Sequence, residues 1–178
     1  SNYKFHEQTT ASEIYNQTNG NIDGFTCAIG TGGTLTGVGL GLKSRDKNIN
    51  IACTDSQGSS MYNYFTKGNL EKKGEPSFTE GIGQARITKN LEMCKVDMSY
   101  YVNDKECIEI LHKLIRTEGL FLGTSSGVNI MGAIKMAKEI GPGKTIVTIL
   151  CDDANKYYDK MFNKEFLNDN GLSIPDWL

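Results

Sequence analysis

Four short apolar runs separated by segments with helical patterns restrict the fold of this 178-residue chain more than any other feature. Apolar runs of four to eight residues are typical of strands that are buried on both faces of a parallel sheet. Strands that alternate with helices predict a doubly wound α/β fold, in which helices flank a mainly parallel sheet. The predicted strands are "FTCAI" (25–29), "INIACT" (49–54), "MSYYV" (98–102) and "TIVTIL" (145–150).

Four helices are expected around these strands. Asp104 is the expected N-terminal cap of the third helix, and Gly119 is its expected stop. The segment 55–92 shows no clean periodicity, which is typical of a long functional loop. The predicted helices are "ASEIYNQT" (11–18), "TGVGLGLKS" (36–44), "DKECIEILHKLIRTEG" (104–119) and "SGVNIMGAIKMAKEIGPG" (126–143).

Composition excludes several classes of function. The net charge of −2 argues against a nucleic-acid partner or a membrane-surface role, since both usually require a basic patch. No apolar run is long enough to cross a bilayer. The five cysteines are odd in number and lack a C-x-x-C pair, so we expect no metal site and a reducing, intracellular compartment, either the cytoplasm or the mitochondrial matrix. Three cysteines lie in apolar runs and are expected to be buried: Cys27, Cys53 and Cys151.

The glycine-rich loop Gly30-Thr31-Gly32-Gly33-Thr34 follows the first predicted strand and precedes a helix. Gly32 and Gly33 permit a close backbone approach, so that successive N–H groups can converge on one anion. The helix adds its N-terminal partial positive charge, and the two threonines add hydroxyl donors. A phosphate suits this arrangement. The alternative is a turn that only allows the helix to pack tightly on the sheet.

Two common phosphate motifs do not match the register of this loop. A dinucleotide-binding G-x-G-x-x-G that starts at Gly30 requires glycine at position 35, where Leu35 stands. A Walker A loop that starts at Gly32 requires lysine at position 38, where Val38 stands. Neither motif therefore explains the loop, and a phosphate site of another class and a packing turn both remain open.

The loop and several later motifs resemble the pyridoxal-phosphate-dependent cysteine synthases (O-acetylserine sulfhydrylases). The matching segments, in the family's order, are "GTGGTLTGVG" (30–39), "TEGIG" (79–83), "EGLFLGTSSGVNIMGAIKMAKEIGPGKTIVTILCDD" (118–153) and the tail "KMFNKEFLNDNGLSIPDWL" (160–178). The resemblance implies the large-domain half of the fold type II architecture of pyridoxal-phosphate enzymes, which is also that of tryptophan synthase β. It also implies that residues 1–178 form a single C-terminal domain that binds the cofactor phosphate.

The resemblance implies that pyridoxal 5′-phosphate is the cofactor. Its phosphate would lie at Gly30, Thr31, Gly32, Gly33 and Thr34, and Gly81 and Gly83 would lie beside its ring. The family carries its Schiff-base lysine in a Ser-x-Lys-Asp-Arg setting in the N-terminal half, and neither that motif nor the substrate-carboxylate loop occurs here. We therefore expect no catalytic residue in this chain. An N-terminal lysine-bearing half would have to be supplied for the family's reaction, which replaces the acetate of O-acetylserine with sulfide.

Asp153 stands where the family commonly has a serine that bonds the pyridine nitrogen, and Ala154 replaces the glycine that follows it. A carboxylate there would stabilise the protonated ring nitrogen. The alternative is that Asp153 caps a helix that begins near Asn155.

Two functions remain open from the sequence. The chain is either the C-terminal half of a working cysteine synthase or a catalytically inactive structural or interaction subunit derived from one. In both cases a domain without its other half would expose an apolar face. The expected partners are the N-terminal half or another protein on that face, within a homo-oligomer or a larger complex.

Overall fold

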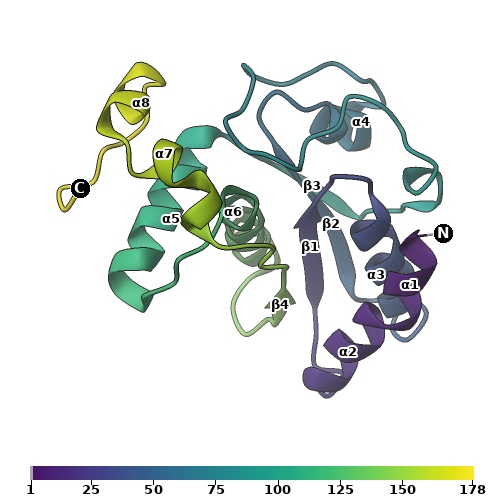
Figure 1. Cartoon of the computed structure of the whole chain (residues 1–178). Coiled ribbons are helices and arrows are strands. Elements are labelled where there is room, and N and C mark those ends of the chain that lie inside the picture. The colour runs from purple at the N-terminus through teal and green to yellow at the C-terminus, as the bar shows by residue number, and fades with distance from the viewer. Residues whose placement is uncertain (1) are drawn as a thin grey trace.

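A computed structural model describes residues 2–178 and contains one four-stranded, wholly parallel sheet in the order β3-β2-β1-β4 (Figure 1). The central strand β1 is paired on both sides, so that Phe25 lies opposite Ile51 of β2 and Val147 of β4. The strands are β1 (Gly24–Ala28), β2 (Asn50–Ser56), β3 (Met98–Val102) and β4 (Ile146–Val147).

The strand order reverses beside β1. From β1 the chain steps outward through β2 to β3, and it then returns to place β4 on the opposite side of β1. In open parallel sheets the connections on the two sides of such a reversal diverge, which leaves a crevice at the carboxyl ends of the two strands. The connection that leaves β1 here is the glycine loop.

Helices cover both faces of the sheet, with α1, α2 and α3 on one side and α5 and α6 on the other (Figure 1). The major helices are α1 (Asn2–Gln8), α2 (Thr10–Gln17), α3 (Gly33–Lys43), α4 (Met61–Lys67), α5 (Asp104–Glu118) and α6 (Thr124–Ile140). The shorter ones are η1 (Leu91–Met93), η2 (Ala154–Tyr157), α7 (Tyr158–Met161) and α8 (Lys164–Asp169). One buried core includes Phe25, Leu42 and Ile51, and a second core joins α5 to the C-terminal helices through Ile108 and Leu167.

The predicted doubly wound α/β fold is confirmed, and the boundaries differ at several points. Helices α3 and α6 begin two or three residues before their predicted starts, and helix α1 was not predicted. The predicted strand 145–150 is reduced to Ile146–Val147, because only Gly24 and Phe25 of β1 pair with it. The cap of α5 is Asn103 and not Asp104: Asn103 and Glu106 form a reciprocal capping box. Among residues 2–178, no helix is long and apolar enough to span a membrane.

Glycines in α3 allow α1 and α2 to pack at very short range. A Cβ atom at Gly37 would overlap the backbone carbonyl of Tyr3, and one at Gly41 would lie 2.5 Å from the Cβ of Ala11. The same helix faces the sheet through Gly39, where a Cβ would meet the side chain of Ile51 at 3.2 Å. The glycine content of α3 therefore reflects contact with fixed backbone on one side and with a movable side chain on the other.

We predict that Gly37→Ala lowers the free energy of unfolding by about 1–2 kcal/mol. Overpacking against backbone atoms costs about 1–3 kcal/mol, which exceeds the gain of about 1 kcal/mol in helix propensity. Gly39→Ala gains the same propensity but meets a side chain that can shift, so it should be close to neutral. Urea unfolding of both variants measures the difference, and equal stability of the two would contradict this account of the packing.

Candidate functional site

The loop Gly30–Thr34 connects the carboxyl end of β1 to the first turn of α3. Gly32 has φ +84°, a conformation that L side chains rarely adopt, and a Cβ there would also lie 2.6 Å from the side chain of Leu91. A Cβ at Gly33 would lie 2.7 Å from the side-chain amide of Asn2. Both glycines are buried, so this loop shape requires them.

The loop presents backbone donors that the described residues do not satisfy. The first intrahelical bond of α3 runs from Thr36 N–H to the carbonyl of Gly32, at 3.1 Å. Within residues 2–178 the N–H groups of Thr34 and Leu35 have no acceptor, and that of Gly33 has only the Thr31 hydroxyl, at 3.4 Å. Free N–H groups at the start of a helix attract anions, because they add to the positive end of the helix dipole. The loop is therefore suited to a phosphate.

Side chains from distant segments fix this loop in place. The carbonyl of Thr31 accepts hydrogen bonds from the Thr88 hydroxyl at 2.7 Å and from the Asn90 amide at 3.2 Å. His6 of α1 lies with Nε2 3.4 Å from the Thr34 hydroxyl and Nδ1 3.0 Å from the Thr10 hydroxyl. The sequence offered no partner for His6, because the contact with Thr34 exists only once α1 has packed on α3.

The segment 79–83, whose Gly81 and Gly83 are predicted to lie beside the cofactor ring, lies directly against the glycine loop. The N–H of Gly83 donates to the carbonyl of Ile29 at 2.9 Å. A Cβ at Gly30 would lie 2.8 Å from the carbonyl oxygen of Gly81. Gly81 and Gly83 have φ values of +76° and +88°. The structure thus brings together seven of the eight residues predicted for the site, namely Gly30, Thr31, Gly32, Gly33, Thr34, Gly81 and Gly83.

A cavity of about 390 Å³ adjoins this junction. Gly81, Ile82, Ser125, Cys151 and Asp152 are among its lining residues. No sequence pattern indicated a role for Asp152. Its Oδ2 accepts from the Tyr157 hydroxyl at 3.0 Å and pairs with Lys156 at 3.3 Å. Burial, together with the nearby Asp152 carboxylate, raises the pKa of Tyr157 to about 12, so this phenol stays protonated at neutral pH.

Asn129 joins the carboxyl ends of β1 and β4. Its side-chain oxygen accepts from the N–H of Ala28 at 2.7 Å, and its amide nitrogen donates to the carbonyl of Ile149 at 2.7 Å and to Cys151 Sγ at 3.6 Å. Cys27 and Cys53 are buried as expected, whereas Cys151 is exposed, because the sheet ends at Val147 and the chain after it leaves the core. The glycine loop and the Cys151-Asp152 segment thus flank the same reversal of strand order.

Asp153 directly follows Asp152 in the sequence, but unlike Asp152 it does not line this cavity. It is exposed, and its Oδ1 accepts from the N–H of Asn155 at 2.8 Å, so it caps η2. The cap that the alternative interpretation expected is therefore present. A carboxylate has a second oxygen, and Oδ2 of Asp153 makes no hydrogen bond within residues 2–178.

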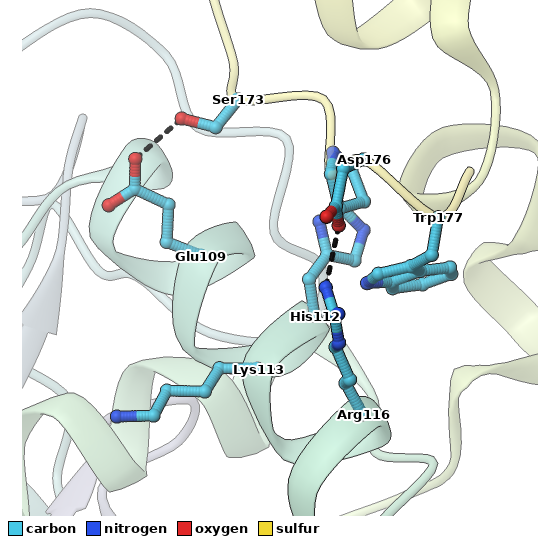
Figure 2. A pocket seen from close by; sticks show the side chains of 8 residues that line it. Glu109, His112, Lys113, Arg116, Ser173, Asp176 and Trp177 are labelled. Carbon is cyan, nitrogen blue, oxygen red and sulfur yellow. Dashed lines mark hydrogen bonds and ion pairs between the residues drawn. The ribbon is translucent and has the colours of Figure 1, made fainter.

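A second cavity, of about 300 Å³, lies between α5 and the C-terminal tail and contains none of the predicted site residues (Figure 2). Arg116 pairs with Asp176 at 2.7 Å, and Glu109 accepts a hydrogen bond from Ser173. His112 lies edge-on to Trp177, and Nε2 is 2.8 Å from the carbonyl of Met161. Burial lowers the pKa of His112, which favours the neutral ring. These contacts hold the tail on α5.

The model of the family "Pyridoxal-phosphate dependent enzyme" matches residues 2–152 of the chain. The chain belongs to this family. It is similar to cysteine synthase 1 of Neurospora crassa (41% identity over 99% of this chain and 49% of that protein) and to the cysteine synthase of Dictyostelium discoideum (38% identity over 99% and 49%). The chain spans about half the length of the curated relatives that it matches.

A solved structure shares the fold. The crystal structure of an O-acetylserine dependent cystathionine beta-synthase from Helicobacter pylori superposes with a TM-score of 0.78 at 30% identity, over 89% of this chain and 49% of that one. The fold is accordingly that of the large-domain half of fold type II pyridoxal-phosphate enzymes. The family cofactor fits the residues seen here, because the glycine loop has unsatisfied donors and Gly81, which lies against Gly30, lines a cavity in the size range of small-ligand sites.

In this pyridoxal-phosphate family member, Asp55 stabilises the backbone that packs against Gly83. It lies near the carboxyl end of β2 and is 1% exposed. Its carboxylate accepts a hydrogen bond from the N–H of Tyr62 at 2.7 Å, which fixes the turn after β2. The hydroxyl of the next residue, Ser56, packs against Gly83. Burial raises the pKa of Asp55 from 3.8 to about 6, although hydrogen bonds from Ser59 and from backbone N–H groups oppose the shift. The folded protein therefore holds this proton at a higher pH than the unfolded chain does.

We predict a pH-dependent stability difference between the wild type and Asp55→Asn. Because the folded pKa is raised, the folded state binds more protons between pH 4 and pH 6, and the Asp55 contribution to the free energy of unfolding falls by about 3 kcal/mol as the pH rises through that window. The substituted asparagine retains an acceptor oxygen but does not titrate, so the variant should gain on the wild type as the pH rises. Urea unfolding at pH 4 and pH 7 measures this, and a constant difference would contradict the raised pKa.

Proposed function

We propose that this domain binds the phosphate of pyridoxal 5′-phosphate at Gly30–Thr34 and acts with a lysine-bearing N-terminal half as a cysteine synthase. The reaction is the replacement of the acetate of O-acetylserine by sulfide to give cysteine. The observation that carries the proposal is the contact between the glycine loop and segment 79–83, at the end of β1, where Gly83 donates to the carbonyl of Ile29. The similarity to cysteine synthases over 99% of the chain supports the substrate class.

Each group at the site has a role that follows from its position. The N–H groups of Gly33, Thr34 and Leu35 and the hydroxyls of Thr31 and Thr34 bind the phosphate. Gly81 and Gly83 leave room for a planar ring where a side chain would occupy the space. Asp153 does not line the cavity, but its Oδ2 would be available to the ring nitrogen while Oδ1 keeps its cap on η2. When bound, pyridoxal phosphate supplies an electron sink that allows a group to leave the β-carbon of an amino acid.

The lysine that bonds the cofactor comes from the N-terminal half, either on the same polypeptide or on a separate one. Leu120, Phe121 and Leu150 are exposed large apolar side chains in two neighbouring segments, which the Leu122–Asp153 bridge joins. Apolar side chains gathered in this way are typical of a covered surface. We assign this face, next to the cavity, to the N-terminal half, which would close the site and exclude water.

The inactive structural subunit is the less favoured function. The relatives that match over 99% of the chain include cysteine synthases and a cystathionine beta-synthase, and the glycine loop keeps every residue that its shape requires. All five cysteines lie in the described part of the chain and each is a free thiol. That finding supports a reducing compartment, the cytoplasm or the mitochondrial matrix.

We predict that Gly32→Ala weakens binding of pyridoxine 5′-phosphate at least tenfold. This probe carries the phosphate and the ring but cannot bond to a lysine, so it reports on this domain alone. The matched control is Gly68→Ala, because Gly68 also has a positive φ (+74°) but has open space around it and caps α4 away from the loop. Both variants lose stability through backbone strain, but only Gly32→Ala should lose affinity. Isothermal titration calorimetry with the probe and with inorganic phosphate measures the affinities.

Catalysis is tested by adding the N-terminal half of a relative that carries the lysine. We expect cysteine formation from O-acetylserine and sulfide with both parts present and none with either alone. Phosphate binding without any restored activity would favour the structural subunit. Absence of binding to either probe would contradict the assignment of the loop itself.

A further inference from the structure

Segment 77–83 has no regular secondary structure, yet it forms one wall of the candidate site. Two of its glycines, Gly81 and Gly83, lie in the left-handed region and give the backbone wide conformational freedom when it is not held. Its glycine end is held by the Gly83–Ile29 hydrogen bond and, one residue later, by hydrogen bonds of Gln84 to Ser59 and Ser60. The position of residues 79–82, which lie before these bonds, depends also on what holds the other end of the segment.

Phe78 fixes that other end. The ring is 9% exposed and belongs to the core that Leu167 and Leu172 form at the C-terminal end of the chain. It meets Phe166 of α8 in a T-shaped contact, with the centroids 6.2 Å apart. Its N–H donates to Asp104 Oδ2 at 2.9 Å, so both the ring and the backbone of residue 78 are held.

A second tie runs to α7. Glu80, two residues after Phe78, forms an ion pair with Lys160. The side chains are 61% and 34% exposed, so this pair contributes little energy by itself. It lies one residue before Gly81, however, and restricts the direction in which the segment leaves Phe78.

We propose that the C-terminal helices α7 and α8 position the 79–83 wall of the cofactor site, with Phe166 and Lys160 as positioning residues. This inference rests on the proposed function for the statement that the site binds a cofactor, whereas the contacts themselves do not depend on it. The tail helices contribute no lining residue near the glycine loop, and they act through Phe78 and Glu80. The aromatic contact supplies most of the energy that holds this segment, and the ion pair restricts the direction in which the backbone leaves Phe78.

The test compares Phe166→Ala and Lys160→Ala with Arg116→Ala. Arg116 of α5 also binds the tail, through Asp176, but it does not touch segment 77–83, so Arg116→Ala is the matched control. Hydrogen exchange at the Gly83 amide reports the local opening of the wall. Calorimetric affinity for pyridoxine 5′-phosphate reports its effect on the site, and urea unfolding reports global stability.

We expect Phe166→Ala to speed exchange at Gly83 about tenfold and to weaken probe affinity, since an aromatic pair contributes about that factor in addition to its buried area. Lys160→Ala should speed exchange about two- to fivefold at unchanged global stability, and adding Glu80→Gln to it should have no further effect. Arg116→Ala should leave both readouts unchanged. Exchange at Gly83 that follows only global stability, or that responds equally to Arg116→Ala, would overturn the proposal.

The same measurements separate this inference from the proposed function. Faster exchange at Gly83 in the tail variants, together with a wild type that binds no probe, would keep the positioning role and refute the cofactor site. If the wild type binds the probe and none of the tail variants alters exchange or affinity, the cofactor site stands and the positioning role fails. Lys160→Ala removes only a surface pair, so it remains informative if Phe166→Ala does not fold.

Discussion

The pairing of β1 on both sides is the constraint on which the rest of this structure depends. β1 pairs with β2 as far as Ala28 and with β4 at Gly24 and Phe25, and the chain after Ala28 turns over the carboxyl edge of the sheet into the glycine loop. Asn129 completes this arrangement, because its side chain bonds the N–H of Ala28 and the carbonyl of Ile149. The glycine loop, the segment 79–83 and the Cys151-Asp152 segment all meet at that edge because β1 ends there.

The sequence predicted those parts of the fold that local patterns determine. The three longer strands follow from apolar runs, and the glycine loop follows from its place between a strand and a helix. Helix α1 was missed because its stability comes from packing against α3, where glycines allow Tyr3 to approach the helix backbone. The end of β4 was placed too late because an apolar run does not reveal where the partner strand stops pairing.

The residues of the candidate site also divide into those that a sequence pattern indicates and those that only packing brings together. The spacing of residues 30–34 indicated a phosphate loop but left a packing turn open, and the family resemblance decided between them and added Gly81 and Gly83. The contacts of His6 with Thr34 and of Thr88 and Asn90 with Thr31 join segments that are far apart in the sequence, so no local pattern indicates them. These contacts shape the loop together with its glycines. They fix the carbonyl of Thr31, which therefore does not accept from the N–H groups at the start of α3.

Asp152 and Asp153 show that the direction of the backbone decides which of two adjacent carboxylates faces the interior of the domain. Asp153 has extended backbone (φ −94°, ψ 169°) and bridges Leu122, and consecutive side chains in extended backbone point to opposite sides. Asp152 and the fully buried Ala154 accordingly face inward, where Asp152 binds the Tyr157 hydroxyl, while Asp153 faces outward. Register in the sequence identifies position 153 as the one that matches the family serine. The bridge to Leu122 leaves the Asp153 carboxylate on the opposite side of this segment from Asp152, which lines the cavity, so the match in register does not by itself bring this carboxylate to the cavity.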